Sequence, residues 1–163
     1  MLKEEIIQAS IESMQDEGLR FSVDSLAKKL KISKKTIYRY FPDKEALAIA
    51  LYEAIFSECE DKIRALLKRP DREALKAMLK AYYRCKWMTR PTVFNKYKLN
   101  EAISAYTSTR LDELRNMILN ASNPVREAEE KEVLSVIVDG AFEKLCEQHK
   151  RPDEVIERLV TLL

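Results

Sequence analysis

The sequence predicts an all-α protein of about nine helices. Only two glycines occur among its 163 residues, so turn-rich β structure has little support. Runs that alternate apolar and polar residues, which would indicate half-buried strands, are absent. Apolar residues instead recur at intervals of three and four, the spacing of a single helix face. A chain of this length can bury a substantial core and form one or two helical domains.

The first two predicted helices lie between residues 2 and 30. A helix over residues 2–17 carries Ile7, Ile11 and Met14 on one face. Ser22 is suited to cap the second helix, because its hydroxyl can accept a hydrogen bond from a free backbone N–H of the first turn. The apolar face of that second helix comprises Val23, Leu26, Ala27 and Leu30.

A tight turn at Lys31 and Ile32 leads into a third helix, which Ser33 can cap. Ile37 and Phe41 lie four positions apart and share the face that anchors this helix. The opposite face and its flanks carry Lys35, Thr36, Tyr38 and Arg39. A short helix that turns cations and hydroxyl groups outward fits the major groove of a duplex, whose walls are lined with phosphates.

The segment over residues 28–44 is strongly basic. It holds seven lysines and arginines and one acidic residue, Asp43, for a net charge of +6, whereas the whole chain carries +2. The rest of the chain must therefore be acidic overall. A local basic patch on a near-neutral protein is the electrostatic footprint of a surface that binds a polyanion.

These segments resemble the TetR (tetracycline-repressor) family of bacterial regulators over roughly the first 50 residues. The matching residues are Glu17-Gly18, Phe21-Ser22-Val23, Leu26-Ala27, Ile32-Ser33-Lys34, Thr36-Ile37-Tyr38, Phe41 and Lys44-Glu45-Ala46-Leu47. The chain departs from the family at Lys31 and Lys35, where the family often has glycine. A left-handed turn residue other than glycine costs about 1 kcal/mol, which a folded domain can bear.

The resemblance implies a helix-turn-helix DNA-binding domain over residues 1–46 and a helical ligand-binding and dimerisation domain over residues 47–163. It places Tyr38 and Lys44 at the edge of the groove, where they would hold phosphates. Lys34, Lys35, Thr36, Arg39 and Tyr40 are the candidates for contact with base edges. With the two capping serines, the predicted DNA-contacting set is Ser22, Ser33, Lys34, Lys35, Thr36, Tyr38, Arg39, Tyr40 and Lys44.

Prolines divide the rest of the chain into further predicted helices. A long helix begins after Asp43, its candidate cap, and continues toward Pro70. Its stripe of apolar residues is Leu47, Leu51, Ile55, Cys59 and Ile63. The next helix turns Leu75, Met78, Leu79, Tyr82 and Trp87 inward, and a short helix near residues 91–97 follows. A helix with Ile103, Tyr106, Leu111, Leu114 and Ile118 precedes a loop over residues 120–124. The last two helices begin near residues 127 and 153.

Soft and aromatic side chains gather in the middle of the sequence. The resemblance implies an inducer pocket there, and its predicted lining is Met78, Tyr82, Trp87, Phe94, Tyr97 and Tyr106. Ordinary core packing is the alternative for each of these residues. Five basic residues lie nearby in the sequence and would suit an anionic ligand: Arg84, Lys86, Arg90, Lys96 and Lys98.

The last two predicted helices carry more apolar surface than one subunit can cover. Gly140 lies inside the first of them, where glycine costs about 1 kcal/mol relative to alanine. Close approach of a second subunit would offset this cost, and a packing glycine within one subunit is the alternative. The predicted two-fold interface comprises Ile137, Gly140, Ala141, Lys144, Val155, Leu159 and Leu162.

Other classes of protein have weaker support. No Gly-rich phosphate loop, Gly-x-Ser-x-Gly elbow or supported Cys–His pair is present, so neither an enzyme nor a bound cofactor is expected. His149 is the only histidine and lacks a second ligand at metal spacing. The N-terminus does not resemble a signal peptide, and no apolar run approaches the ~18 residues that span a bilayer. We therefore expect a cytoplasmic protein with no membrane segment.

The three cysteines, Cys59, Cys85 and Cys146, are odd in number and far apart in the sequence. This pattern favours reduced thiols over a disulfide framework. A redox switch is the less favoured interpretation, because no basic cluster flanks a pair of them in the sequence.

The sequence therefore predicts a dimeric regulator that binds double-stranded DNA at a pseudo-palindromic operator and, by the resemblance, is a repressor released by a small-molecule inducer. One alternative is a ligand-independent activator or architectural DNA-binding protein of the same fold. Another is a helical interaction module whose basic patch meets an acidic protein.

Overall fold

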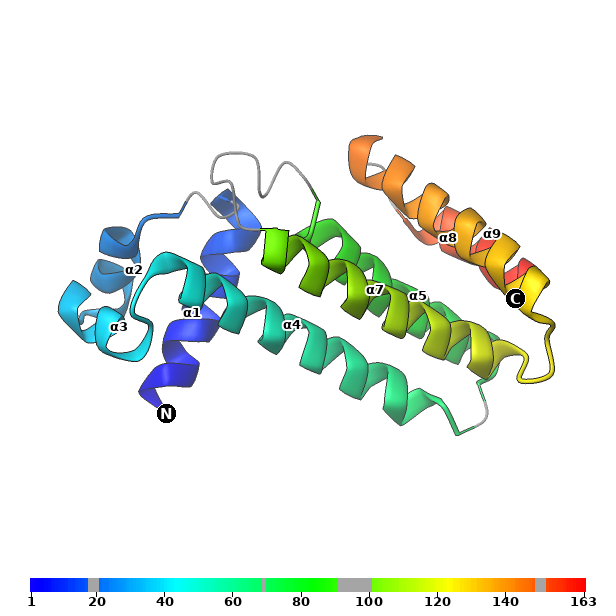
Figure 1. The fold of residues 1–163 in the computed structure, drawn as a ribbon, viewed down its shortest axis with the longest axis horizontal. Helices are drawn as coiled ribbons and strands as arrows, with labels where there is room; N and C mark the ends of the chain where they lie inside the picture. The colour runs from blue at the N-terminus through cyan, green and yellow to red at the C-terminus, as the bar shows by residue number, and fades with distance from the viewer. Residues whose placement is uncertain (18–20, 69, 91–100, 149–151) are drawn as a thin grey trace. The chain divides into compact units, whose positions relative to one another are not determined.

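The structure is a computed structural model and describes residues 1–17, 21–68, 70–90, 101–148 and 152–163. These ranges contain eight helices and no strand (Figure 1). The helices are α1 (Leu2–Glu17), α2 (Val23–Leu30), α3 (Lys34–Tyr40), α4 (Lys44–Leu66), α5 (Arg72–Met88), α7 (Glu101–Ser122), α8 (Ala128–Gln148) and α9 (Asp153–Leu162). The predicted all-α class is confirmed. The short helix expected to carry Val93, Phe94 and Tyr97 lies outside the described residues.

The chain forms two compact units. The first comprises residues 1–56 and 88–107, and the second comprises residues 57–87 and 108–163. The division falls inside α4, which continues without a break beyond the boundary predicted between residues 46 and 47. That domain boundary remains a prediction.

In the first unit, α1 packs against α2, and α2 packs against α3 (Figure 1). Both predicted caps are present: the backbone N–H of Ser25 donates to Ser22 Oγ at 2.9 Å, and that of Thr36 donates to Ser33 Oγ at 3.0 Å. Lys31 has φ 55° and ψ 37°, the left-handed conformation that the turn requires. The following N–H, of Ile32, donates back to the carbonyl of Ala27 at 3.0 Å, which closes the end of α2.

The core of the first unit agrees with the predicted apolar faces except at Ile7 of α1 and Leu30 of α2, which are half-buried. Ile37 and Phe41 are both buried and anchor α3 as expected. In α1, Ile11 and Met14 are buried as predicted, whereas Ile7 is half-buried and Ile6 is fully buried in its place. The buried apolar side chains of α1 are Ile6, Ala9, Ile11 and Met14, and Ser10 is buried as well.

The long helix α4 begins where the sequence predicts. The N–H of Ala46 donates to Asp43 Oδ1 at 2.7 Å, which confirms Asp43 as a cap. The predicted stripe is buried throughout: Leu47, Leu51, Ile55, Cys59 and Ile63. Within the first unit, Tyr52 donates its hydroxyl to the carbonyl of Met88 at 3.3 Å.

Rings and ion pairs connect the helices of the second unit. Phe142 of α8 packs against Tyr82 and Tyr83 of α5, with ring centroids 5.8 and 5.2 Å apart. The inward residues predicted for α5 are buried, apart from Trp87, which is half-buried. α8 packs against α9. Arg72 of α5 binds Glu157 of α9, so α9 is fastened to α5 by charged groups as well.

One expectation for this unit was wrong in detail. The loop predicted over residues 120–124 begins later, because α7 continues through Ser122 and ends two residues before Pro124. A proline disfavours the helical conformation of the residue before it, here Asn123, so Pro124 rather than Asn120 sets the end of the helix. In α8, Val133, Val136 and Ile137 are exposed, whereas Leu134, Val138 and Phe142 form the buried stripe. Among the described residues, no helix is both long enough and apolar enough to cross a bilayer.

Candidate nucleic-acid interface

The outer face of α3 carries the predicted contact residues. Lys35 and Arg39 are exposed, and Tyr38 and Tyr40 keep 39% and 38% of their surface. The Arg39 guanidinium lies 5.8 Å from the centroid of the Tyr40 ring, close enough for a cation–π contact. The face therefore presents two cations and two phenols around a helix whose opposite side is buried.

Lys34 is engaged within the protein. Its Nζ lies 2.9 Å from Asp24 Oδ2, so it connects the first turn of α3 to α2. The hydrogen bond to Asp24 raises the pKa of Lys34 above its ordinary value. Both groups are exposed, so the pair is weak and can exchange Asp24 for another anion. Lys34 thus differs from Lys35, for which no ion pair is observed in the described parts of the chain.

The hydroxyl groups of the predicted set are used in caps. Ser22 Oγ and Ser33 Oγ accept from the first turns of α2 and α3, respectively. Ser33 Oγ also lies 2.7 Å from Thr36 Oγ1, and Thr36 is half-buried. These three residues fix the geometry of the turn, and their oxygens have less freedom to meet a ligand than the ends of Lys35 and Arg39.

Lys44, the first residue of α4, holds the chain that precedes α2. Its Nζ donates to the backbone carbonyl of Phe21 at 2.7 Å and lies 4.9 Å from the centroid of the Phe21 ring. An ammonium group has three donors and can bind more than one oxygen. The sequence did not indicate this internal role, because Phe21 and Lys44 are 23 positions apart.

The residues predicted to line an inducer pocket fall into three groups. Met78 and Tyr82 are fully buried in the second unit. Trp87 and Tyr106 are half-buried, and Tyr106 packs edge-on against Phe56 within the first unit with centroids 6.0 Å apart. Phe94 and Tyr97 lie outside the described residues.

A polar cluster in the second unit surrounds Asp139 of α8. Tyr82 donates its hydroxyl to Asp139 Oδ1 at 2.5 Å, and Lys86 Nζ lies 3.4 Å from the same oxygen. Arg115 of α7 binds the other carboxylate oxygen, Oδ2, and also Asp112 at 2.9 Å. Burial, with the nearby Asp139 charge, raises the pKa of Tyr82 well above its usual range. Asp139 thus accepts bonds from both α5 and α7.

The predicted interface residues of α8 share a face with exposed apolar residues that the sequence analysis missed. At 100° per residue, Val133, Val136, Ile137, Gly140 and Lys144 lie within about one third of the helix circumference. Val133, Val136 and Ile137 are 58%, 69% and 40% exposed. A helical projection of residues 133–144 could have separated this face from the buried stripe. Ala141 is half-buried at its edge.

Gly140 is not required by packing inside the described chain. A Cβ built at this position meets no atom within 4 Å, and the residue is exposed. The alternative of a packing glycine within one subunit therefore loses its support.

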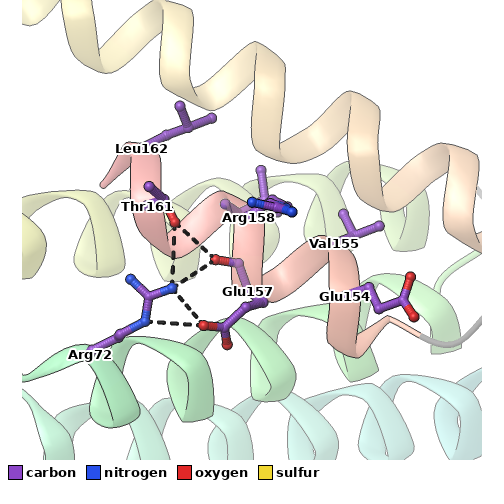
Figure 2. A pocket seen from close by; sticks show the side chains of 8 residues that line it. Arg72, Glu154, Val155, Glu157, Arg158, Thr161 and Leu162 are labelled. Atoms are coloured by element: carbon purple, nitrogen blue, oxygen red, sulfur yellow. Dashed lines mark hydrogen bonds and ion pairs between the residues drawn. The ribbon is translucent and has the colours of Figure 1, made fainter.

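A groove of about 640 Å³ follows the outer side of α9 (Figure 2). Three of its lining residues, Val155, Leu159 and Leu162, belong to the predicted interface. Leu162 is 52% exposed and Val155 half-buried, whereas Leu159 is buried within the single chain. At the rim, Arg72 donates to Glu157 Oε1 at 2.5 Å and approaches Thr161 Oγ1 at 3.4 Å (Figure 2).

The N-terminal segment matches a known family. Residues 6–51 match the model for bacterial regulatory proteins of the tetR family. This match places the N-terminal segment of the chain in the TetR family. The match includes most of the first three helices and the start of α4, and it confirms the resemblance drawn from the turn, the caps and the Ile37–Phe41 anchor.

Individual proteins are similar to this chain in sequence or in fold. Nucleoid occlusion factor SlmA from Marinobacter nauticus is 40% identical over 63 residues, which cover 36% of this chain and 32% of that protein. The chain thus matches about a third of the length of this curated relative. A transcriptional regulator from Aquifex aeolicus has a TM-score of 0.70 at 20% identity, covering 98% of this chain and 95% of its own. A TetR/AcrR-family regulator from Thermobifida fusca has a TM-score of 0.65 at 20% identity, covering 98% and 94%. The two structures show that the TetR-family fold extends over nearly the whole chain.

Within the described ranges, no group of three or more His, Cys, Asp or Glu side chains could hold a metal ion. His149 lies outside those ranges.

Proposed function

We propose that this TetR-family protein is a sequence-specific regulator of transcription that binds double-stranded DNA as a homodimer. The observation that carries the proposal is the arrangement of α3, where Ile37 and Phe41 are buried while Lys35, Arg39 and Tyr38 face outward. A helix of this kind can enter the major groove with its cations toward base edges and phosphates.

The contacts inside the protein refine the expected roles. Lys35 and Arg39 are the best candidates for base edges, because the described structure gives them no ion pair that fixes their ends. Lys34 and Lys44 have internal oxygen partners, Asp24 and the Phe21 carbonyl, and suit phosphate contacts at the edge of the groove. Tyr40 stacks beside Arg39 and would limit its range of orientations.

A homodimer is proposed because α8 and α9 leave apolar side chains uncovered. Val133, Val136 and Ile137 on α8 and Leu162 on α9 are exposed large apolar residues, and Gly140 lies among those of α8. A symmetric copy can cover such a surface with the same surface of its own. Two subunits would place their recognition helices in successive major grooves, about 34 Å apart.

We further propose that the protein is a repressor and that a small molecule lowers its affinity for DNA. The support is the family and the polar cluster of Asp139, Tyr82 and Arg115, which joins three helices of the second unit. A ligand that favours another arrangement of these helices would favour another dimer geometry. A ligand-independent activator or architectural protein of the same fold remains the alternative.

The deciding experiment is selection of bound duplexes from a random pool, followed by titration of the enriched duplex over a range of salt concentrations. We expect a pseudo-palindromic sequence and a steep fall of affinity with salt. Lys35→Ala should alter the enriched sequence. The matched control is Lys62→Ala, which removes an exposed lysine of α4 and should leave the enriched sequence unchanged. If no sequence is enriched, and if an acidic protein displaces the chain from DNA as well as any duplex does, the interaction-module alternative would be favoured.

A further inference from the structure

An acidic side chain lies beside the predicted DNA-contacting face. Asp24, in the first turn of α2, places its carboxylate oxygen Oδ2 2.9 Å from Nζ of Lys34, the first residue of α3. The Asp24 side chain is 64% exposed and that of Lys34 is 47% exposed. Among the described residues, no other acidic side chain forms an ion pair with a residue of α3. The segment around α3 is otherwise basic, so a carboxylate at this place repels an approaching polyanion.

Asp24 also has a local role, because a negative charge in the first turn of a helix interacts favourably with the helix dipole. That role does not require a partner ten positions away in the sequence. The pairing follows from the turn between the two helices. The Ile32 N–H donates to the Ala27 carbonyl at 3.0 Å, and the Ser33 side chain caps α3, so the turn fixes how α3 follows α2. The folded turn therefore brings the carboxylate beside Lys34 before any DNA is bound.

We propose that Asp24 is an internal competitor for DNA phosphate at Lys34 and that it lowers the affinity of the protein for every duplex. The inference rests on the proposed DNA-binding function, in which Lys34 meets a phosphate at the edge of the groove. A phosphate oxygen and the Asp24 carboxylate are both anionic partners for one ammonium group. Binding of DNA therefore either breaks the internal ion pair or brings two negative groups close together, and each costs free energy.

The same argument separates affinity from sequence preference. Contacts to phosphates fix the position of a protein on the duplex but carry no sequence information directly. The competition by Asp24 therefore weakens binding to preferred and to unrelated duplexes by the same factor. In this respect Asp24 differs from Lys35 and Arg39, whose substitution is expected to change which sequences are preferred.

A second ion pair of the first unit provides the comparison. Glu12 of α1 lies 2.9 Å from Lys29 of α2, and their side chains are 52% and 48% exposed, so this pair resembles the first in distance and in exposure. Its lysine lies in the last turn of α2 and not in α3. Glu12→Gln and Asp24→Asn each remove one negative charge from the same unit, but only the second removes the partner of Lys34.

The test is a double-mutant cycle on the full-length chain, titrated at low salt with two labelled duplexes, the enriched sequence and a scrambled one. Asp24→Asn should lower the dissociation constant for both duplexes by the same factor, roughly two- to fivefold, as expected for one exposed ion pair. In a Lys34→Ala background the same substitution should have little further effect. Glu12→Gln should change the affinity by the same factor in both backgrounds. Asp24→Ala repeats the comparison without an amide oxygen near Lys34, and urea unfolding checks that each variant is folded.

Three results would overturn the inference. The folded Asp24 variants could bind no more tightly than the wild type, or they could change the ranking of the two duplexes. Their gain could also be equally large without Lys34, which would assign the effect to net charge alone. A wild-type chain that binds neither duplex at low salt would instead refute the proposed function, and the inference with it, because Asp24 would then have no phosphate to compete with.

Discussion

Replacing Gly140 by leucine should affect the folding of one subunit and the association of two subunits in opposite directions. Within one chain, a Cβ at residue 140 meets nothing within 4 Å, so the new side chain causes no clash there. Leucine is a better helix former than glycine by roughly 0.8 kcal/mol, and the free energy of unfolding of the monomer should rise by about that amount.

At a dimer interface the same leucine would be forced between two closely packed helices. Overpacking of this kind costs typically about 1–3 kcal/mol. At about 1.4 kcal/mol for each factor of ten, the dissociation constant of the dimer should rise roughly 5- to 150-fold. The effect would be larger if both copies of the leucine meet at the two-fold axis.

Sedimentation equilibrium over a range of concentrations measures the dissociation constant of the dimer. Urea unfolding at the lowest of these concentrations measures the free energy of unfolding of the monomer. Asn116→Leu, at an exposed position of α7, is the control for adding a leucine to a helix surface. An unchanged dissociation constant for Gly140→Leu would show that the interface lies elsewhere. A monomer that becomes less stable would show that residue 140 packs within its own chain.

Three further predictions concern the DNA-contacting face and the polar cluster. Lys35→Ala and Arg39→Ala should change which sequences are preferred in a duplex panel; uniform weakening would count against base contact by either residue. Lys44→Ala should weaken binding to all duplexes and reduce the salt slope by about one, with urea unfolding run in parallel because its Nζ also holds a backbone carbonyl. Asp139→Ala should lower the free energy of unfolding by about 2–3 kcal/mol. This is at or below the low end for a broken buried ion pair, because the carboxylate is 28% exposed. A loss below about 0.5 kcal/mol in urea unfolding would show that Arg115 finds other partners.

The elements that depend on local sequence were predicted well. Ser22, Ser33 and Asp43 act within three residues of their own positions, so the sequence contains nearly all the information that determines these caps. The turn at Lys31 follows from the same local rules. The resemblance to the family supplied the expected fold, because the residues characteristic of the family lie in this turn and at the buried anchors of α3, Ile37 and Phe41.

Contacts between distant segments could not be predicted in the same way. The periodicity of α8 shows that it has apolar residues on two sides, but not which side meets its own chain. The exposure of Val133 and Val136 was therefore not predicted. Lys34 and Lys44 were judged by their positions beside the recognition helix, whereas their nearest partners are set by tertiary packing.

The position of Asp139 connects the proposed ligand response to the proposed dimer. Asp139 and Gly140 are neighbours on α8, about 100° apart on its circumference. The first accepts bonds from Tyr82 of α5 and Arg115 of α7, and the second lies on the exposed face with Val136 and Ile137. Because the two residues share one helical backbone, α8 cannot rotate at Asp139 without turning the face that contains Gly140. A ligand that draws Tyr82 or Arg115 away from Asp139 would thus release a rotational restraint on the proposed interface. Tyr82→Phe, which removes only one of these bonds, should make dimerisation more sensitive to temperature while α8 stays helical, as sedimentation and circular dichroism can measure.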